Sequence, residues 1–125
     1  MSFSEKVAHI AHGTEVLASW FGEGGHAVPP STSQARADIC LNHCPHNRPN
    51  SNLTKAIALA FRRYLEVKNT IGLRVRGEKR LFECDICACQ LRLKVHEPTS
   101  LLKRRMQEGE RERFPDYCWQ RNETK

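Results

Sequence analysis

Apolar side chains recur at helical spacing in the first part of the chain. Phe3, Val7, Ile10, Leu17 and Phe21 are spaced by three, four or seven positions, which predicts an amphipathic helix over residues 1–22, ended by Gly22. The next stretch, residues 23–35, is rich in glycine and proline and is expected to be a linker. Residues 36–125 then form the predicted compact domain.

Within this domain, residues 50–71 place their apolar positions on one helical face, so a second helix is expected there. Leu91, Leu93 and Val95 alternate with polar residues, a period of two that predicts a half-buried strand. A further helix is expected from residue 101 to 113. The pattern predicts an α+β fold that is mostly helical, with a short ribbon-like hairpin.

Composition limits what such a fold can be. The chain has 125 residues, of which 39% are hydrophobic, so its apolar core is small and a cross-link would help it fold. The longest apolar run, residues 56–61, is far below the roughly 20 residues that cross a bilayer. Residues 1–6 have no apolar signal core. We therefore expect a cytoplasmic protein with no membrane partner.

The cysteines indicate where a cross-link could form. The six cysteines could form three disulfides, but in a reducing compartment cysteines more often bind metal than form disulfides. A Cys-x-x-Cys turn points two thiolates at one ion, and tetrahedral zinc takes four such ligands at about 2.3 Å. A second pair lies four residues apart, so we expect a ribbon-like zinc site. The six candidate ligands are Cys40, Cys44, Cys84, Cys87, Cys89 and Cys118.

Several zinc arrangements fit these ligands. One zinc could take four of the six thiolates, two zincs could share all six through bridging sulfurs, or histidines could complete two separate sites. His43 and His46 flank Cys44 and are the candidate nitrogen ligands or hydrogen-bond donors to the ligands. A pair of exposed turn histidines would look the same in sequence. Four thiolates on one zinc, or six on two, leave a net charge of −2.

The stretch Cys84-Asp85-Ile86-Cys87-Ala88-Cys89-Gln90-Leu91 resembles small cysteine-rich zinc-binding proteins of tailed bacteriophages and prophages. The likeness extends to the Arg36–Cys40 lead-in, to Cys44-Pro45 and to Cys118-Trp119. In that family the turn usually reads Cys-x-x-Cys-Gly-Cys-Pro-Leu, whereas this chain has Ala88 and Gln90 at the Gly and Pro positions. The resemblance covers roughly residues 36 to 119. It implies a viral protein of a bacterial host cell, with all six cysteines in metal sites, and it implies little about activity.

Charge is concentrated between the cysteine groups. Residues 51–80 hold eight basic and two acidic side chains, and this difference equals the net charge of +6 of the whole chain. Because Lys and Arg neutralise phosphates, the segment predicts non-catalytic nucleic-acid binding. A basic face that only keeps the protein in solution would have the same composition. The candidate contacts are Arg62, Arg63, Arg74, Arg76, Lys79 and Arg80.

Two other functions are compatible with the same features. The chain could be a phage-encoded interaction module or inhibitor that docks on an acidic surface of a host protein, with residues 1–22 as interface or homodimer element. A metal-dependent nuclease is a third option, because His43, His46 and Asn47 lie beside the zinc frame. No paired carboxylates with suitable spacing are present to hold a catalytic magnesium, which argues against an enzyme.

Overall fold

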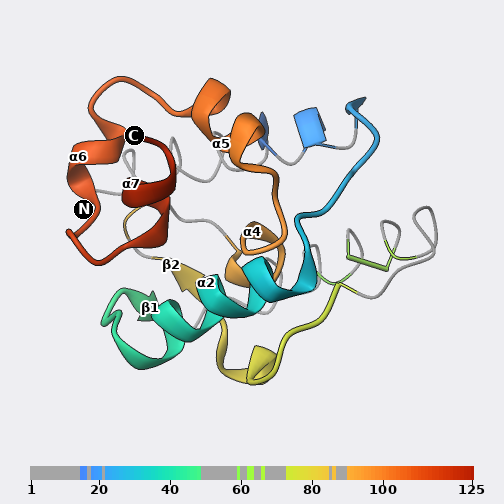
Figure 1. Ribbon diagram of the computed structural model, residues 1–125, viewed down its shortest axis with the longest axis horizontal. Coiled ribbons are helices and arrows are strands. Elements are labelled where there is room, and N and C mark those ends of the chain that lie inside the picture. The colour runs from blue at the N-terminus through green and yellow to red at the C-terminus, as the bar shows by residue number, and fades with distance from the viewer. Residues whose placement is uncertain are drawn as a thin grey trace.

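The computed structural model describes residues 15–16, 18–20, 22–48, 59, 62–63, 66, 73–84, 86 and 90–125. In this part of the chain the elements are α2 (Pro30–Asn42), β1 (Asn47–Arg48), η1 (Glu78–Arg80), β2 (Glu83–Cys84), α4 (Leu91–Lys94), α5 (Thr99–Arg105), α6 (Glu110–Arg113) and α7 (Trp119–Glu123). Helices predominate and one small antiparallel sheet is present, so the predicted mostly helical α+β class is confirmed. In Figure 1 the helices α5, α6 and α7 lie on one side of α2.

Helix α2 runs through the middle of the fold and begins earlier than expected. It starts at Pro30, so the second half of the predicted linker, residues 30–35, is helical. Proline suits this first helical position because its missing N–H would have no intrahelical partner and its φ is already helical. The two prolines that suggested a linker therefore mark a helix start. Of the first predicted helix, the described residues 15–16, 18–20 and 22 are helical.

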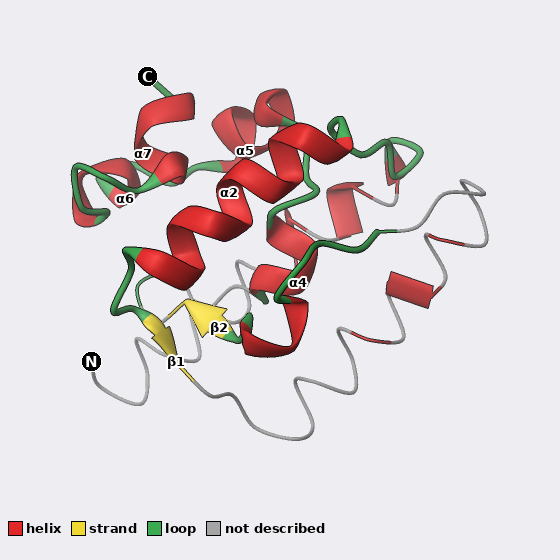
Figure 2. Ribbon diagram, turned by 60° about the horizontal axis from the view of Figure 1, so that its bottom comes forward, coloured by secondary structure: helices red, strands yellow, loops and turns green. Residues whose placement is uncertain are grey.

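The sheet consists of β1 and β2, which pair antiparallel with Asn47 opposite Cys84 and Arg48 opposite Glu83. Figure 2 shows this pair beyond the end of α2 and close to α4. An isolated antiparallel bridge joins Glu83 to Gln90, and the Leu91 N–H donates to the Phe82 carbonyl at 2.9 Å. The sheet therefore brings together segments more than thirty residues apart, and the bridge places Gln90 beside β2.

The predicted strand at Leu91, Leu93 and Val95 is wrong, because this segment forms helix α4. Leu91 and Val95 belong to one buried cluster, whereas Leu93 belongs to a second one built around Trp20. The intervening Lys94 is also buried. The alternation of apolar and polar residues therefore does not separate a buried face from a solvent-exposed face, because α4 lies between two apolar clusters.

The helix expected from residue 101 to 113 is divided into α5 and α6. Gly109 precedes α6 with φ of 78°, a left-handed conformation that glycine adopts without steric cost. This turn redirects the chain and lets Phe114 enter the main cluster. Of the second predicted helix, residues 59, 62, 63 and 66 are helical, and the remainder lies outside the described residues.

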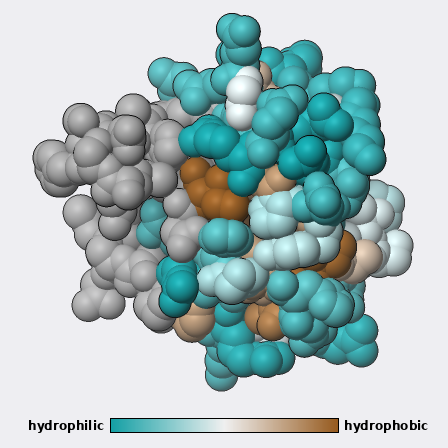
Figure 3. All heavy atoms as spheres, turned by 90° about the vertical axis from the view of Figure 1, so that its left-hand side faces the viewer, coloured by the Kyte–Doolittle hydropathy of each residue, from teal (hydrophilic) through white to brown (hydrophobic). Residues whose placement is uncertain are grey.

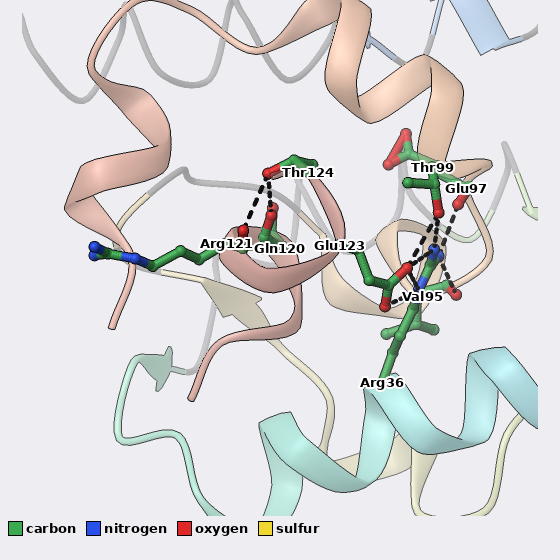
Figure 4. A network of polar contacts seen from close by, with 8 residues as sticks. All are labelled: Arg36, Val95, Glu97, Thr99, Gln120, Arg121, Glu123 and Thr124. Atoms are coloured by element: carbon green, nitrogen blue, oxygen red, sulfur yellow. Dashed lines mark hydrogen bonds and ion pairs between the residues drawn. The ribbon is translucent and has the colours of Figure 1, made fainter. Parts of the chain in front are cut away.

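Arg36 of α2 is the most heavily bonded side chain of the described interior (Figure 4). Its guanidinium is 1% exposed and donates to the carbonyls of Val95 at 3.1 Å and Glu97 at 2.7 Å. It also donates to the Thr99 hydroxyl at 3.0 Å and forms an ion pair with Glu123 at 2.6 Å. A single arginine thus joins α2, the turn between α4 and α5, and α7.

The surface of the described part is mainly polar. Tyr117 is the one large hydrophobic side chain there that is exposed, at 39%. On the face in Figure 3, hydrophilic residues cover most of the described atoms, with hydrophobic atoms visible between them. Within the described ranges, no helix has both the length and the apolar character needed to cross a membrane.

Replacing Arg36 with methionine is expected to lower the free energy of unfolding by about 3 kcal/mol or more, because buried carbonyls lose their donors. Glu123→Gln is the control, since it keeps a hydrogen-bond acceptor at a position that is 30% exposed. Urea unfolding of both variants measures the difference. Equal, small losses in the two variants would contradict a central role for Arg36.

His96 is a buried neutral base beside this network. Its side chain is 4% exposed, and its Nδ1 lies 3.0 Å from the Ser33 hydroxyl. Burial is the main cause that lowers the pKa of His96 to about 4, and the positive charges of Arg62 and Arg36 lower it further, whereas Glu78 opposes them. The folded protein therefore resists protonation of this ring.

Stability is expected to fall on acidification because of His96. Below its ordinary pKa of 6.5 the unfolded chain binds a proton that the folded chain rejects until about pH 4, so each pH unit in this window costs at most ~1.4 kcal/mol. Burial raises the pKa of Glu97, which acts in the opposite direction. His96→Gln retains Glu97, so urea unfolding at pH 7 and pH 5 should show a smaller loss in the variant. Identical losses would refute this assignment.

Candidate metal centre and basic turn

Two predicted ligands lie at the end of α2. Cys40 is buried in the last turn of the helix, and Cys44 is half-buried in the loop that leads into β1. The side chain of Asn47 fixes this loop, since its amide donates to the Arg80 carbonyl at 2.7 Å and its oxygen accepts from the Phe82 N–H at 2.8 Å. These two bonds hold the Cys44 loop against the chain that enters β2.

The second cysteine group begins at the end of β2. Cys84 is buried and ends this strand, and an antiparallel bridge pairs Glu83 with Gln90. Cys87 and Cys89 lie outside the described residues.

The C-terminal turn, which we define as residues 115–119, brings the last cysteine to the same region. The Cys118 N–H donates to the Pro115 carbonyl at 3.0 Å, and α7 begins at the next residue. Cys118 is buried in the cluster that also contains Cys40 and Cys84. The indole Nε1–H of Trp119 donates to the Cys40 sulfur at 3.3 Å. Three separate chain segments thus contribute thiols to one region.

The thiols lie close enough to influence one another. Burial raises the pKa of Cys40 to about 12, the nearby Cys44 and Cys118 raise it further, and the bond from Trp119 acts against this increase. Burial likewise raises the pKa of Cys118, with a further contribution from Cys44. Without a cation these buried thiols are therefore neutral. A cation would reverse this preference, because thiolates are the form that binds metal.

Cysteine thiols are suitable zinc ligands, but the described cysteines do not form a complete metal site. The four cysteines that the structure describes are free thiols. In the same part of the chain, no three Cys, His, Asp or Glu side chains are arranged to hold a metal ion. His43 is exposed at the end of α2, and His46 is half-buried. Among the described residues, neither histidine is part of a group that could hold a metal ion.

The basic turn, which we define as residues 74–80, is attached firmly to this frame. The Gln34 side chain of α2 accepts from the Arg76 N–H at 2.8 Å and donates to its carbonyl at 3.3 Å. Gly77 has φ of 80°, a left-handed conformation that favours glycine, and a Cβ there would lie 2.7 Å from the end of the Leu41 side chain, which would have to shift. On the other side, Asn47 of β1 donates to the Arg80 carbonyl at 2.7 Å and Arg92 of α4 donates to the Lys79 carbonyl at 3.5 Å. The backbone of the turn is therefore held on both sides.

The six candidate contact residues separate into two groups. Arg62 is buried and pairs with Glu78 at 2.8 Å, so its assignment to a binding surface is corrected to an interior role. Arg74 also pairs with Glu78, at 3.1 Å, and with Glu66 at 3.6 Å, but its side chain remains 61% exposed. The other members are exposed: Arg63, Arg76, Lys79 and Arg80.

Sequence reasoning missed the side chains that assemble these features. Gln34 and Asn47 each bond backbone groups far along the chain, and Trp119 reaches a sulfur 79 positions earlier. Asn47 had one local signal, because it follows a cysteine turn where polar side chains often bond backbone groups. No local signal predicts the partners of Gln34.

Comparisons of the chain with family models, with curated proteins and with solved structures find no match in any of the three. The resemblance to phage zinc-binding proteins thus depends on the cysteine motifs alone and stays a prediction.

Proposed function

We propose that this protein is a non-catalytic zinc-binding protein that binds nucleic acid through its basic turn. The observation that carries the proposal is the attachment of this turn to the cysteine frame by the side chains of Gln34 and Asn47. The same contacts that would order a zinc centre would hold cationic side chains in a fixed arrangement beside it.

Zinc is supported by the kind and placement of the donors. Cys40, Cys84 and Cys118 share one buried cluster with Cys44 beside them, and a buried set of neutral thiols offers a soft cation its preferred ligands once they lose their protons. The chain is small, and its described core is divided into two clusters. A structural metal would supply the cross-link that so small a core needs.

Nucleic-acid binding is supported by charge and rigidity together. Arg76, Lys79 and Arg80 are exposed on a turn whose backbone is bonded to α2 and β1, so little backbone freedom would be lost on binding a phosphate chain. The acidic side chains of the segment, Glu66 and Glu78, are engaged with Arg62 and Arg74. The remaining cations are therefore not neutralised by these two carboxylates.

Chelation is expected to destabilise the protein. We expect one or two zinc ions per purified chain by elemental analysis, and removal of the metal should lower the melting temperature by roughly 10 °C or more, because structural zinc contributes folding free energy. The same chelator saturated with zinc beforehand is the control. A metal-free protein that melts at the same temperature with and without chelator would refute the zinc proposal.

Charge reversal in the basic turn is expected to weaken binding. Arg76→Glu should raise the Kd for labelled single-stranded or duplex nucleic acid about tenfold and reduce the slope of log K against log salt by roughly one to two. Fluorescence anisotropy at several salt concentrations measures both quantities. Arg105→Glu makes the same charge change at an exposed position of α5 and should leave Kd within about twofold.

If neither form of nucleic acid binds at low salt, the nucleic-acid proposal fails. The same exposed cations would then favour the second candidate, docking on an acidic protein surface. An equal loss in Arg76→Glu and Arg105→Glu would instead show that only the net charge matters.

A further inference from the structure

Two arginines and two glutamates at the start of the basic turn form a closed ring of ion pairs. In this charge ring each arginine lies beside both carboxylates, and its members are Arg62, Glu66, Arg74 and Glu78. We infer that the charge ring withholds Arg74 from nucleic acid, an inference that rests on the proposed function. The phosphates then contact the exposed cations beyond the ring, which are Arg76, Lys79 and Arg80.

The guanidinium of Arg74 is held by two carboxylates at once. Its Nη1 donates to Glu78 Oε1 at 3.1 Å, and its Nε lies 3.6 Å from Glu66 Oε2. The same Glu66 oxygen accepts from the Leu73 N–H at 3.2 Å, so the backbone that enters the basic turn fixes its position. The side chains of Glu66 and Glu78 are only 21% and 18% exposed. Arg74 is therefore engaged by fixed acceptors although most of its own side chain faces solvent.

A buried cation keeps the charge ring closed. Arg62 donates to Glu78 Oε2 at 2.8 Å and lies 3.8 Å from Glu66, and an enclosed guanidinium depends on carboxylates that remain beside it. The four groups together are formally neutral. If Arg74 left them to bind a phosphate, one positive and two negative charges would remain. This excess negative charge beside an anionic ligand would oppose binding.

The cations beyond the ring are placed differently. A Cβ at Gly77 would lie 3.3 Å from Nη2 of Arg80, so this guanidinium lies beside the glycine of the turn. Glu78 is the carboxylate of the same turn, and its two oxygens are engaged with the ring arginines. Gln34 and Asn47 hold the backbone of the turn without help from the ring. The exposed cations therefore project from a fixed backbone that does not depend on Arg74.

Two double variants of the full-length protein, both with its unaltered net charge, test this division of the cations. Arg74→Gln/Glu78→Gln removes one cation and one carboxylate of the ring, and it should leave the slope of log K against log salt unchanged and Kd within about threefold. Arg80→Gln/Glu108→Gln removes an expected contact and an exposed carboxylate elsewhere, so it should reduce the slope by about one and raise Kd about fivefold. Fluorescence anisotropy with labelled single-stranded and duplex nucleic acid measures both quantities.

A slope that falls by about one in Arg74→Gln/Glu78→Gln would make Arg74 a phosphate contact and overturn the inference, while the proposed function would stand. Unchanged slopes in both double variants would also overturn it, because the phosphates would then bind elsewhere. If the unaltered protein binds neither form of nucleic acid at low salt, the proposed function and the inference both fail. Should the first double variant unfold, Arg74→Gln/Glu66→Gln decides instead, because it leaves the 2.8 Å pair between Arg62 and Glu78 in place.

Discussion

The fold depends on one buried cation. Arg36 is almost fully enclosed, and the cost of removing its charge from water is offset by bonds to two carbonyls, one hydroxyl and the carboxylate of Glu123. These partners come from the turn between α4 and α5 and from α7. The same guanidinium covers the Trp119 ring, which reaches the sulfur of Cys40. A polar interaction, and not only apolar packing, therefore connects the C-terminus to the cysteines.

The remaining contacts extend this arrangement to the surface. Asn47 and Gln34 bond the backbone on either side of the basic turn, so the turn is part of the same framework as α2 and the sheet. Zinc bound by these cysteines would cross-link the chain segments that carry Cys40, Cys84 and Cys118. A protein built in this way would present its exposed cations from a rigid support. This link between an ordered interior and a charged surface underlies the proposed binding role.

The sequence allowed the general class of fold to be predicted, but several elements were predicted incorrectly. The mostly helical α+β class follows from apolar spacing, whereas the alternation at Leu91, Leu93 and Val95 suggested a strand because nothing local reveals that both sides of α4 are buried. Nothing local in the sequence reveals that Arg62 is buried in an ion pair with Glu78 and is therefore not a surface cation. The spacing of the cysteines allowed them to be predicted as candidate metal ligands. The hydrogen bonds that bring the cysteine segments together join residues far apart in the chain, such as Trp119 and Cys40. The local sequence pattern carries no information about such partners.

The central proposal is that the cysteines form a sulfur-ligated zinc centre. X-ray absorption at the zinc edge on the purified full-length protein tests it most directly. The account predicts a first coordination shell made mainly of sulfur, at a distance of about 2.3 Å. A protein that holds no zinc, or a shell made of nitrogen and oxygen, would contradict it.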